Sequence, residues 1–352
     1  LSYFKFNQGT ANENNTGLSS VTDSSSNNVS GSFNNMALTG TTSNFVTGII
    51  TNNSISALAQ SICLNGSASS LTSSLNGGTG LTFQWYSNTT NSTSGSTLIG
   101  SATNATYTPP STTAGTKYYY CIVSASGNGC TSVTSSIVLV TVVADPAITV
   151  QPTAITQCIG GTGALSLTAT GGTPSLTYQW YSNVANSNSG GSIITGATSS
   201  TYTPSSSSAG TTYYYCIVSA SGDGCASTTS SAVAVIIQTT PTAGTIAASQ
   251  TICNGGDPAA FTSSSDGTGV GAITYIWQSS ADNLTYTSIA GATSSTYDVP
   301  TGLTASTYYK RLTVSTLNSV ACLSVASNVL SVTVQTVPTA GSIASSQTIC
   351  YN

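Results

Sequence analysis

Short stretches of alternating apolar and polar residues recur along the chain, separated by clusters of Gly, Ser, Asn and Pro. In residues 176–181, for example, Leu176, Tyr178 and Trp180 share one face of an extended strand, because side chains in a strand alternate between two faces. No segment keeps apolar residues at helical spacing for more than a turn. The pattern therefore predicts an all-β chain with almost no helix.

The pattern also repeats along the chain. The run Gln-Trp-Tyr-Ser-Asn occurs at 84–88 and at 179–183, and the ten residues 118–127 recur identically at 213–222. Residues 339–350 copy 242–253, so we interpret the chain as a segment of a longer repetitive protein. An alternative is that this last stretch is an exchanged strand. The predicted divisions are an N-terminal β-rich linking segment, three full repeats and the first strand of a truncated fourth repeat: 1–49, 50–143, 144–240, 241–337 and 338–352.

Each repeat has the features of an immunoglobulin-like β-sandwich. About 95 residues, a central Trp and, in two repeats, a Tyr two positions before a Cys are typical of this fold, in which the Trp fills the core and the Tyr fixes a corner. We expect tandem sandwiches with these core residues: Trp85, Trp180, Trp277, Tyr119, Tyr214 and Tyr309. A second set of tyrosines points outward in the predicted strands. We expect them to pack across strands rather than to form a sugar-stacking surface: Tyr118, Tyr120, Tyr213 and Tyr215.

Nine cysteines indicate an oxidising compartment if their spacing forms a disulfide framework. An antibody-type bridge needs a Cys on the second strand, where Leu165 and Leu167 stand instead. We therefore predict that the first and last cysteines of each repeat pair: Cys63 with Cys130, Cys158 with Cys225, and Cys253 with Cys322. Of the three remaining cysteines, Cys121 and Cys216 are predicted to be buried thiols, since repeat three has Arg311 at that position, and Cys350 belongs to the truncated fourth repeat.

The composition argues against catalysis. Only 3% of residues are charged, there is no His, and the only Glu is Glu13. Ser and Thr abound but lack a base, and the Asp residues are scattered, so we predict no enzyme, no cofactor and no metal site. Four basic residues cannot form a nucleic-acid surface. No run reaches the roughly 18 apolar residues of a membrane span.

The chain resembles very large secreted surface proteins of Bacteroidota, including gliding-motility adhesins exported by the type 9 secretion system. The Phe-Asn-Gln-Gly start at 6–9, the run Leu-Thr-Gly-Thr-Thr-Ser-Asn-Phe-Val at 38–46, the Ile-Cys-x-Gly-type repeat start and the Tyr-Gln-Trp-Tyr strand carry this resemblance. It implies an extracellular, cell-surface location and immunoglobulin-like arrays.

We predict a structural or adhesive segment of a surface fibre, a rigid, disulfide-linked stalk whose partners are neighbouring domains or further copies. Each junction between repeats contains a Pro, which restricts bending. Three alternatives remain open: a carbohydrate-binding module that contacts surface glycans, a filament subunit that exchanges strands, and a spacer of a secreted enzyme.

Overall fold

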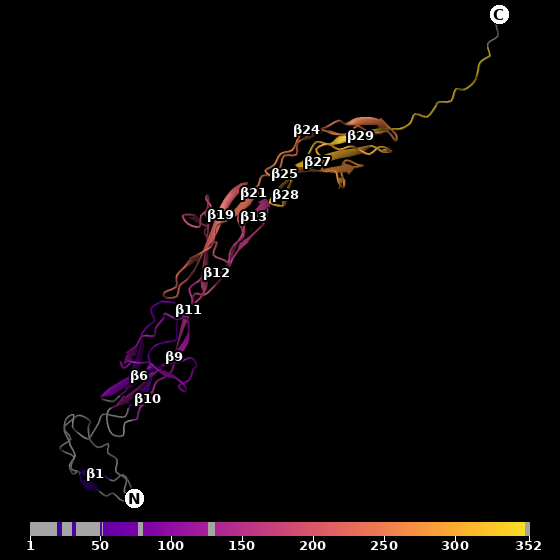
Figure 1. The fold of residues 1–352 in the computed structure, drawn as a ribbon. Coiled ribbons are helices and arrows are strands. Elements are labelled where there is room, and N and C mark those ends of the chain that lie inside the picture. The colour runs from indigo at the N-terminus through magenta and orange to yellow at the C-terminus, as the bar shows by residue number, and fades with distance from the viewer. Residues whose placement is uncertain are drawn as a thin grey trace. The chain divides into compact units, whose positions relative to one another are not determined.

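A computed structural model describes residues 20–22, 30–32, 50, 52–76, 80–125 and 131–348 (Figure 1). Within these residues all regular secondary structure is β, which confirms the predicted all-β class. The chain forms two compact units. The first comprises Leu1–Thr149, Ala169–Tyr178 and Ile217–Thr228; the second comprises Val150–Thr168, Gln179–Cys216 and Thr229–Asn352.

In the first unit, repeat one forms a sandwich of two sheets. The larger sheet has the strand order β4-β11-β9-β6-β7, with β10 also paired to β9. Its strands are β4 (Gln60–Cys63), β6 (Leu81–Asn88), β7 (Thr97–Leu98), β9 (Gly115–Ala125), β10 (Val133–Thr134) and β11 (Val138–Val143). The smaller sheet contains β3 (Asn52–Ile55), β5 (Leu71–Asn76) and β8 (Thr106–Tyr107). β4 runs parallel to β11, so Cys63 lies beside Val143.

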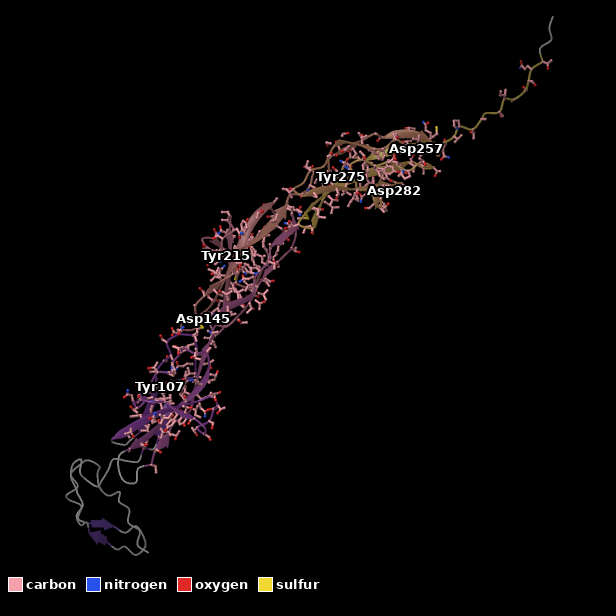
Figure 2. The ribbon with its side chains drawn as sticks, viewed as in Figure 1. Tyr107, Asp145, Tyr215, Asp257, Tyr275 and Asp282 are labelled. Carbon is pink, nitrogen blue, oxygen red and sulfur yellow. A yellow bond between two sulfur atoms is a disulfide. The ribbon has the colours of Figure 1, made fainter. Side chains whose placement is uncertain are left out.

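The core of this sandwich is aromatic. Trp85 is fully buried, and its indole N–H donates to the carbonyl oxygen of Asn104 at 2.9 Å. Tyr107, which Figure 2 labels, lies against both Trp85 and Tyr119, with its ring centroid 5.8 and 5.7 Å from theirs. The alternation of the sequence thus places one apolar face of each sheet inside, and the indole nitrogen still has an acceptor.

Repeat two contributes strands to both units. They are β12 (Ala147–Val150), β13 (Ile155–Cys158), β14 (Leu165–Ser166), β15 (Thr168–Thr170), β16 (Leu176–Asn183), β17 (Ser192–Ile193), β18 (Thr201–Tyr202), β19 (Gly210–Ala220), β20 (Thr228–Thr229) and β21 (Val233–Gln238). β13 runs parallel to β21, as β4 does to β11. Trp180 is fully buried, and Tyr214 is 8% exposed.

Repeat three lies in the second unit and keeps the same strand order, β23-β29-β27-β25-β26, with β28 on β27. Figure 1 shows β25 and β27 side by side. The strands are β22 (Thr245–Ala247), β23 (Gln250–Cys253), β24 (Thr262–Ser265), β25 (Ala272–Ser280), β26 (Thr287–Ser288), β27 (Thr307–Leu317), β28 (Val320–Ala326) and β29 (Leu330–Gln335). Trp277 is fully buried, and Tyr309 is 3% exposed.

Repeat three has a cation in its core. Arg311 is fully buried, and its guanidinium stacks 4.3 Å from the ring of Tyr275. It donates to Ser263 Oγ at 3.0 Å, to the Ser295 carbonyl at 2.6 Å and to the Ser265 carbonyl at 3.2 Å. Burial lowers the pKa of this guanidinium. The departure of repeat three from the other two at this position therefore changes the interior of the sandwich.

The two ends of the chain show little regular structure among the described residues. Near the start, β1 (Ser20–Thr22) pairs with β2 (Ser30–Ser32), and most of 1–49 lies outside the described residues. Residues 338–348 are exposed and form no strand. In repeat three the corresponding strands, β22 and β23, pair with β24 and β29, which follow them in the repeat. The stretch 338–348 lacks such later strands among the described residues.

Candidate functional site: the disulfide junctions

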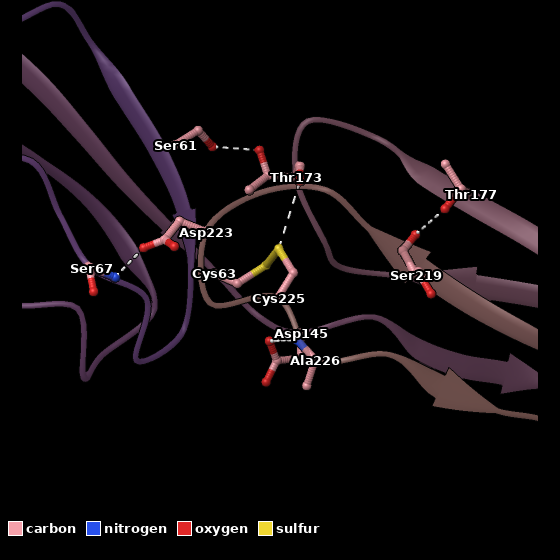
Figure 3. Close-up of a disulfide and its surroundings, with 10 residues drawn as sticks. All are labelled: Ser61, Cys63, Ser67, Asp145, Thr173, Thr177, Ser219, Asp223, Cys225 and Ala226. Atoms are coloured by element: carbon pink, nitrogen blue, oxygen red, sulfur yellow. Dashed lines mark hydrogen bonds between the residues drawn. A yellow bond between two sulfur atoms is a disulfide. The ribbon is translucent and has the colours of Figure 1, made fainter.

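The most distinctive site in the first unit is a disulfide that joins repeat one to repeat two (Figure 3). Cys63 is the last residue of β4, and Cys225 lies in the loop between β19 and β20. The two residues are 162 positions apart in the sequence, and their Cα atoms are 4.8 Å apart. The bond therefore connects the end of one sandwich to a loop of the next.

Hydrogen bonds surround this disulfide. The Cys63 N–H donates to the carbonyl oxygen of Asp223 at 2.9 Å, and the Asp223 carboxylate accepts the N–H of Ser67 (Figure 3). The hydroxyls of Ser61 and Thr173 are 2.8 Å apart. The loop of repeat two is therefore bound to repeat one through backbone and side chains as well as through sulfur.

The two backbones approach too closely for side chains. Gly224 has a φ of 75°, and a Cβ placed on it would lie 2.2 Å from the Cα of Gly66. A Cβ on Gly66 would in turn lie 2.4 Å from the carbonyl oxygen of Asp223. Glycine is required at both positions, since any larger residue would force the loop away from β4.

The carboxylates at this junction have structural partners. Asp145, in the linker between the repeats, accepts the N–H of Ala226 at 3.2 Å (Figure 3). Within the part of the chain that the structure describes, no three His, Cys, Asp or Glu side chains gather to hold a metal ion. Asp282 in repeat three is similarly engaged, because N–H groups of Thr285 and Leu284 bind its carboxylate and lower its pKa to about 2.

A second junction lies in the second unit. Cys158, the last residue of β13, is bonded to Cys322 in β28, with their Cα atoms 5.7 Å apart. The hairpin β27–β28 turns through Asn318 and Ser319, both with positive φ, as a two-residue type I′ turn requires. Asn318 Nδ2 donates to the Thr156 hydroxyl at 3.0 Å.

Gln238 adds a buried hydrogen bond at this second junction. Its side chain is 1% exposed, and its Nε2 donates to the carbonyl oxygen of Val320 at 3.1 Å. Gln238 pairs with Cys158 in the parallel ladder of β13 and β21. Gln238 and Cys158, which lie at the same end of the larger sheet of repeat two, therefore contact the same hairpin of repeat three, β27–β28.

The predicted pairing within each repeat is wrong. The structure pairs Cys63 with Cys225 and Cys158 with Cys322, while Cys253 is an exposed thiol and Cys130 lies outside the described residues.

Strand register explains why a bridge within repeat three is impossible. Cys253 is level with Gln335 at one end of the sheet, whereas Cys322 is level with Ser315 near the other end. Because Thr307 is level with Val332, these positions are about eleven residues, or roughly 35 Å, apart along the strands. A disulfide needs Cα atoms within about 7 Å.

Cys121 and Cys216 are fully buried and take no part in the disulfides. Burial raises the pKa of the Cys216 thiol to about 11 and also raises the pKa of the Cys121 thiol. Few thiolates therefore form at neutral pH, so neither residue suits a nucleophilic role.

Two tyrosines of the second set, Tyr120 and Tyr215, pack across strands. Tyr120 stacks on Tyr86, with ring centroids 5.2 Å apart, and Tyr215 stacks on Tyr181 at 5.1 Å. Tyr120 and Tyr215 are each 3% exposed (Figure 2 labels Tyr215). Tyr118 and Tyr213 are half-buried. Buried rings cannot stack on a sugar, so the two most buried tyrosines do not form a glycan-binding surface.

Fold and junctions together define a class of protein: tandem immunoglobulin-like domains with disulfides. The chain belongs to the family described as "Domain of unknown function (DUF8696)", whose model matches residues 51–144 and 242–336. Residues 144–238 match the model "Ig-like domain CHU_C associated". No curated protein matches the chain in sequence.

Several solved structures are similar to the chain. The I-band fragment I67–I69 from titin is 12% identical, with 80% of this chain and 98% of that chain covered and a TM-score of 0.41. The three N-terminal domains of the highly immunogenic outer capsid protein of bacteriophage RB49 are 16% identical, with 82% and 99% covered and a TM-score of 0.42. Extracellular domains 3–5 of Drosophila OTK are 15% identical, with 82% and 97% covered and a TM-score of 0.31.

This class of protein indicates a general function and location. Tandem immunoglobulin-like folds are typical of structural and adhesive proteins, and the disulfides indicate an extracellular protein. Among the described residues, no helix is long and apolar enough to cross a membrane.

Proposed function

We propose that this chain is a stalk segment of an extracellular cell-surface fibre of the kind found in the giant adhesins of Bacteroidota. One observation carries the proposal: each disulfide that the structure describes joins the end of one repeat to a loop or hairpin of the next. An enzyme spacer or a ligand-binding module does not need neighbouring domains to be bonded in this way, whereas a load-bearing stalk benefits from it.

The disulfides give each junction a second covalent connection. Repeats one and two are joined by the linker that follows Val143 and also by the bond between Cys63 and Cys225. Bending at the linker must then distort the loop at Cys225 or break the hydrogen bonds of Asp223. Two connections side by side therefore resist hinge motion more strongly than a short linker alone.

The repeat divisions belong to the same proposal. We assign 50–143, 144–240 and 241–337 as the repeating elements of the stalk, with 1–49 as a linking segment and 338–352 as the start of a fourth element. The polar surface supports this assignment, because abundant Ser, Thr and Asn hydrate a fibre with few charges. Such a surface changes little with salt, since few charges are available to be screened.

Antibody labelling of intact cells of the source organism tests the proposal. An antibody raised against repeat two should label unpermeabilised cells, and limited protease treatment from outside should remove the signal. Labelling that requires permeabilisation would overturn the surface location.

Chemical reduction of the disulfides tests whether they stiffen the chain. Small-angle scattering of the oxidised chain should show a narrower range of shapes than scattering of the reduced chain. Identical curves would overturn the role of the disulfides in stiffness. A glycan array run in parallel separates the proposed stalk from a carbohydrate-binding module, which would give reproducible, saturable binding.

A further inference from the structure

The end of repeat three that carries Cys253 has the same backbone structure as the two ends that carry disulfides. In each repeat the Cys ends a strand parallel to the last strand of the larger sheet. Two residues later the chain adopts a positive φ of 63°, 82° or 78°, at Asn65, Gly160 and Gly255. The next N–H then returns to the Cys carbonyl at 3.0, 3.0 and 2.9 Å, from Gly66, Gly161 and Gly256.

At the first two ends, an element of the following repeat contacts the strand end that carries the Cys. Asp223 and Cys225 approach Cys63 and Gly66 in the first unit. In the second unit, the hairpin of Cys322 is bonded to Cys158 and accepts a hydrogen bond from Gln238 through the Val320 carbonyl. The same position in the repeat therefore binds the same element of its neighbour twice in one chain.

Repeat three presents the same groups uncovered. The Cys253 thiol is exposed and outside any disulfide. Gln335 pairs with Cys253 in the parallel ladder as Gln238 pairs with Cys158, yet Gln335 is exposed whereas Gln238 is buried. The three atoms nearest to a Cβ placed on Gly256 belong to Ile252 and Cys253, whereas the two nearest to a Cβ placed on Gly66 belong to Asp223.

We propose that this Cys253 end is a docking site for the cysteine-bearing hairpin of a further immunoglobulin-like repeat, with which Cys253 forms a disulfide. The inference rests on the proposed function, since it extends the same junction to one more element. The occupant is a repeat rather than a small molecule because residues 339–350 copy 242–253, so the chain itself starts another repeat beside the site.

The bond forms by oxidation of two thiols. Cys253 and the hairpin cysteine together lose two protons and two electrons to a disulfide oxidant. Oxidised glutathione serves as that oxidant in the test, and its own disulfide is reduced to two thiols by exchange.

The test uses a chain extended by one repeat, in which residues 1–337 are followed by a second copy of 241–337 that itself carries Cys253→Ser, so that the chain holds a single Cys253. The protein is refolded with oxidised and reduced glutathione, remaining thiols are alkylated, and disulfide-linked peptides are mapped by mass spectrometry without reduction. We expect Cys253 to be bonded to the second copy of Cys322 in most molecules. In a matched extended chain carrying Cys253→Ser in both copies, that second copy of Cys322 should instead be alkylated.

The same peptide map separates two kinds of failure. If Cys63–Cys225 and Cys158–Cys322 are present but Cys253 is alkylated or bonded elsewhere, the docking inference is overturned and the proposed stalk stands. If those two bonds are also absent from a chain with folded sandwiches, shown by near-UV circular dichroism of its tryptophans, the proposed function fails as well. In the unextended chain, Cys253 should react with a maleimide without denaturant, whereas Cys121 should not.

Discussion

Removal of the two disulfides, singly and together, should change the extensibility of the chain in a non-additive way. The bridges interleave along the sequence, because Cys158 lies within the loop closed by Cys63–Cys225, and Cys225 lies within the loop closed by Cys158–Cys322. A chain pulled from both ends follows its shortest covalent path. That path reaches Cys63, crosses to Cys225, returns along the chain to Cys158 and crosses to Cys322.

The positions of the two disulfides determine how much the contour length of the chain increases when a disulfide is removed. With both bridges intact, 64–157 and 226–321, about 190 residues together, cannot be extended. Cys63→Ser leaves the Cys158–Cys322 bridge as a shortcut, so the path lengthens by only about 28 residues, or roughly 10 nm at about 3.5 Å per residue. Cys158→Ser gives nearly the same value. Loss of both bridges releases about 190 residues, or roughly 65 nm.

Single-molecule force spectroscopy provides the assay. The full chain is held by handles at its two ends, thiols left after folding are blocked with iodoacetamide, and the contour length is measured once every repeat has unfolded. Three variants are compared with the parent chain: Cys63→Ser, Cys158→Ser and the double substitution. Cys121→Ser serves as the control, since it removes a buried thiol without touching a bridge.

Bridges within each repeat would give a different result. Each single substitution would then release one loop of about 66 residues, roughly 23 nm, and the two effects would add. Equal, additive increments would refute the interleaved arrangement. A small increment for each single variant with a several-fold larger one for the double variant would support it.

Three further changes test individual features. Gly224→Ala should lower the urea midpoint at least twice as much as Gly196→Ala, for which we expect a loss of about 1 kcal/mol. Both positions have a positive φ, but only a Cβ on Gly224 would meet Gly66. Equal losses would contradict the close approach of the two backbones. Arg311→Ala should destabilise repeat three by roughly 3 kcal/mol, since the carbonyls it binds lose their donors; a loss below about 1 kcal/mol in chemical unfolding would refute this. The folded-state pKa of Cys216, about 11, exceeds its reference value of 9.0, so this thiol stabilises the fold below pH 9 and the gain is lost as pH rises to 11. Thermal melts should show a loss of roughly 2–3 kcal/mol over that window, and Cys216→Ala should abolish that part of the slope.

The sandwich fold could be predicted from the sequence because its determinants are local. Period-two alternation places Trp85, Trp180 and Trp277 on inner faces, and the structure buries all three. The tyrosine pairs follow from the same alternation, since Tyr86 and Tyr120 are direct partners across β6 and β9. Each of these inferences needs only neighbours along a strand or across one ladder.

The disulfide pairing could not be predicted from spacing, because it depends on which ends of the sandwich meet. A pairing inferred from cysteine spacing assumes that the cysteines of one repeat bond to each other. In the structure, however, β23 runs parallel to β29 and places Cys253 at the end of the sheet opposite Cys322. A signal was present in the fold itself. The strand that ends in the first cysteine of a repeat runs parallel to the last strand, so it must end where the linker leaves and beside the next repeat.

The burial of Arg311 could not be predicted from the sequence for a different reason. Its presence in place of Cys121 and Cys216 marks a local difference in repeat three, but charge alone suggests a surface position. The structure instead buries the guanidinium, because Ser263 and two carbonyls provide acceptors and Tyr275 provides a ring face. Acceptors from two separate segments, β24 and the loop at Ser295, cannot be recognised in a linear sequence.

The interleaved bonds also mean that a sequence repeat and a compact unit are different objects in this protein. Residues 169–178 and 217–228 of repeat two pack with repeat one, and the bond to Cys63 lies inside that unit. A cut at the sequence boundary near residue 144 would therefore separate Cys225 and Asp223 from their partners and expose the glycine-lined backbone at Gly66. Cooperative unfolding should then follow the bonded junctions rather than the repeats, since neither half of a junction keeps its hydrogen bonds alone.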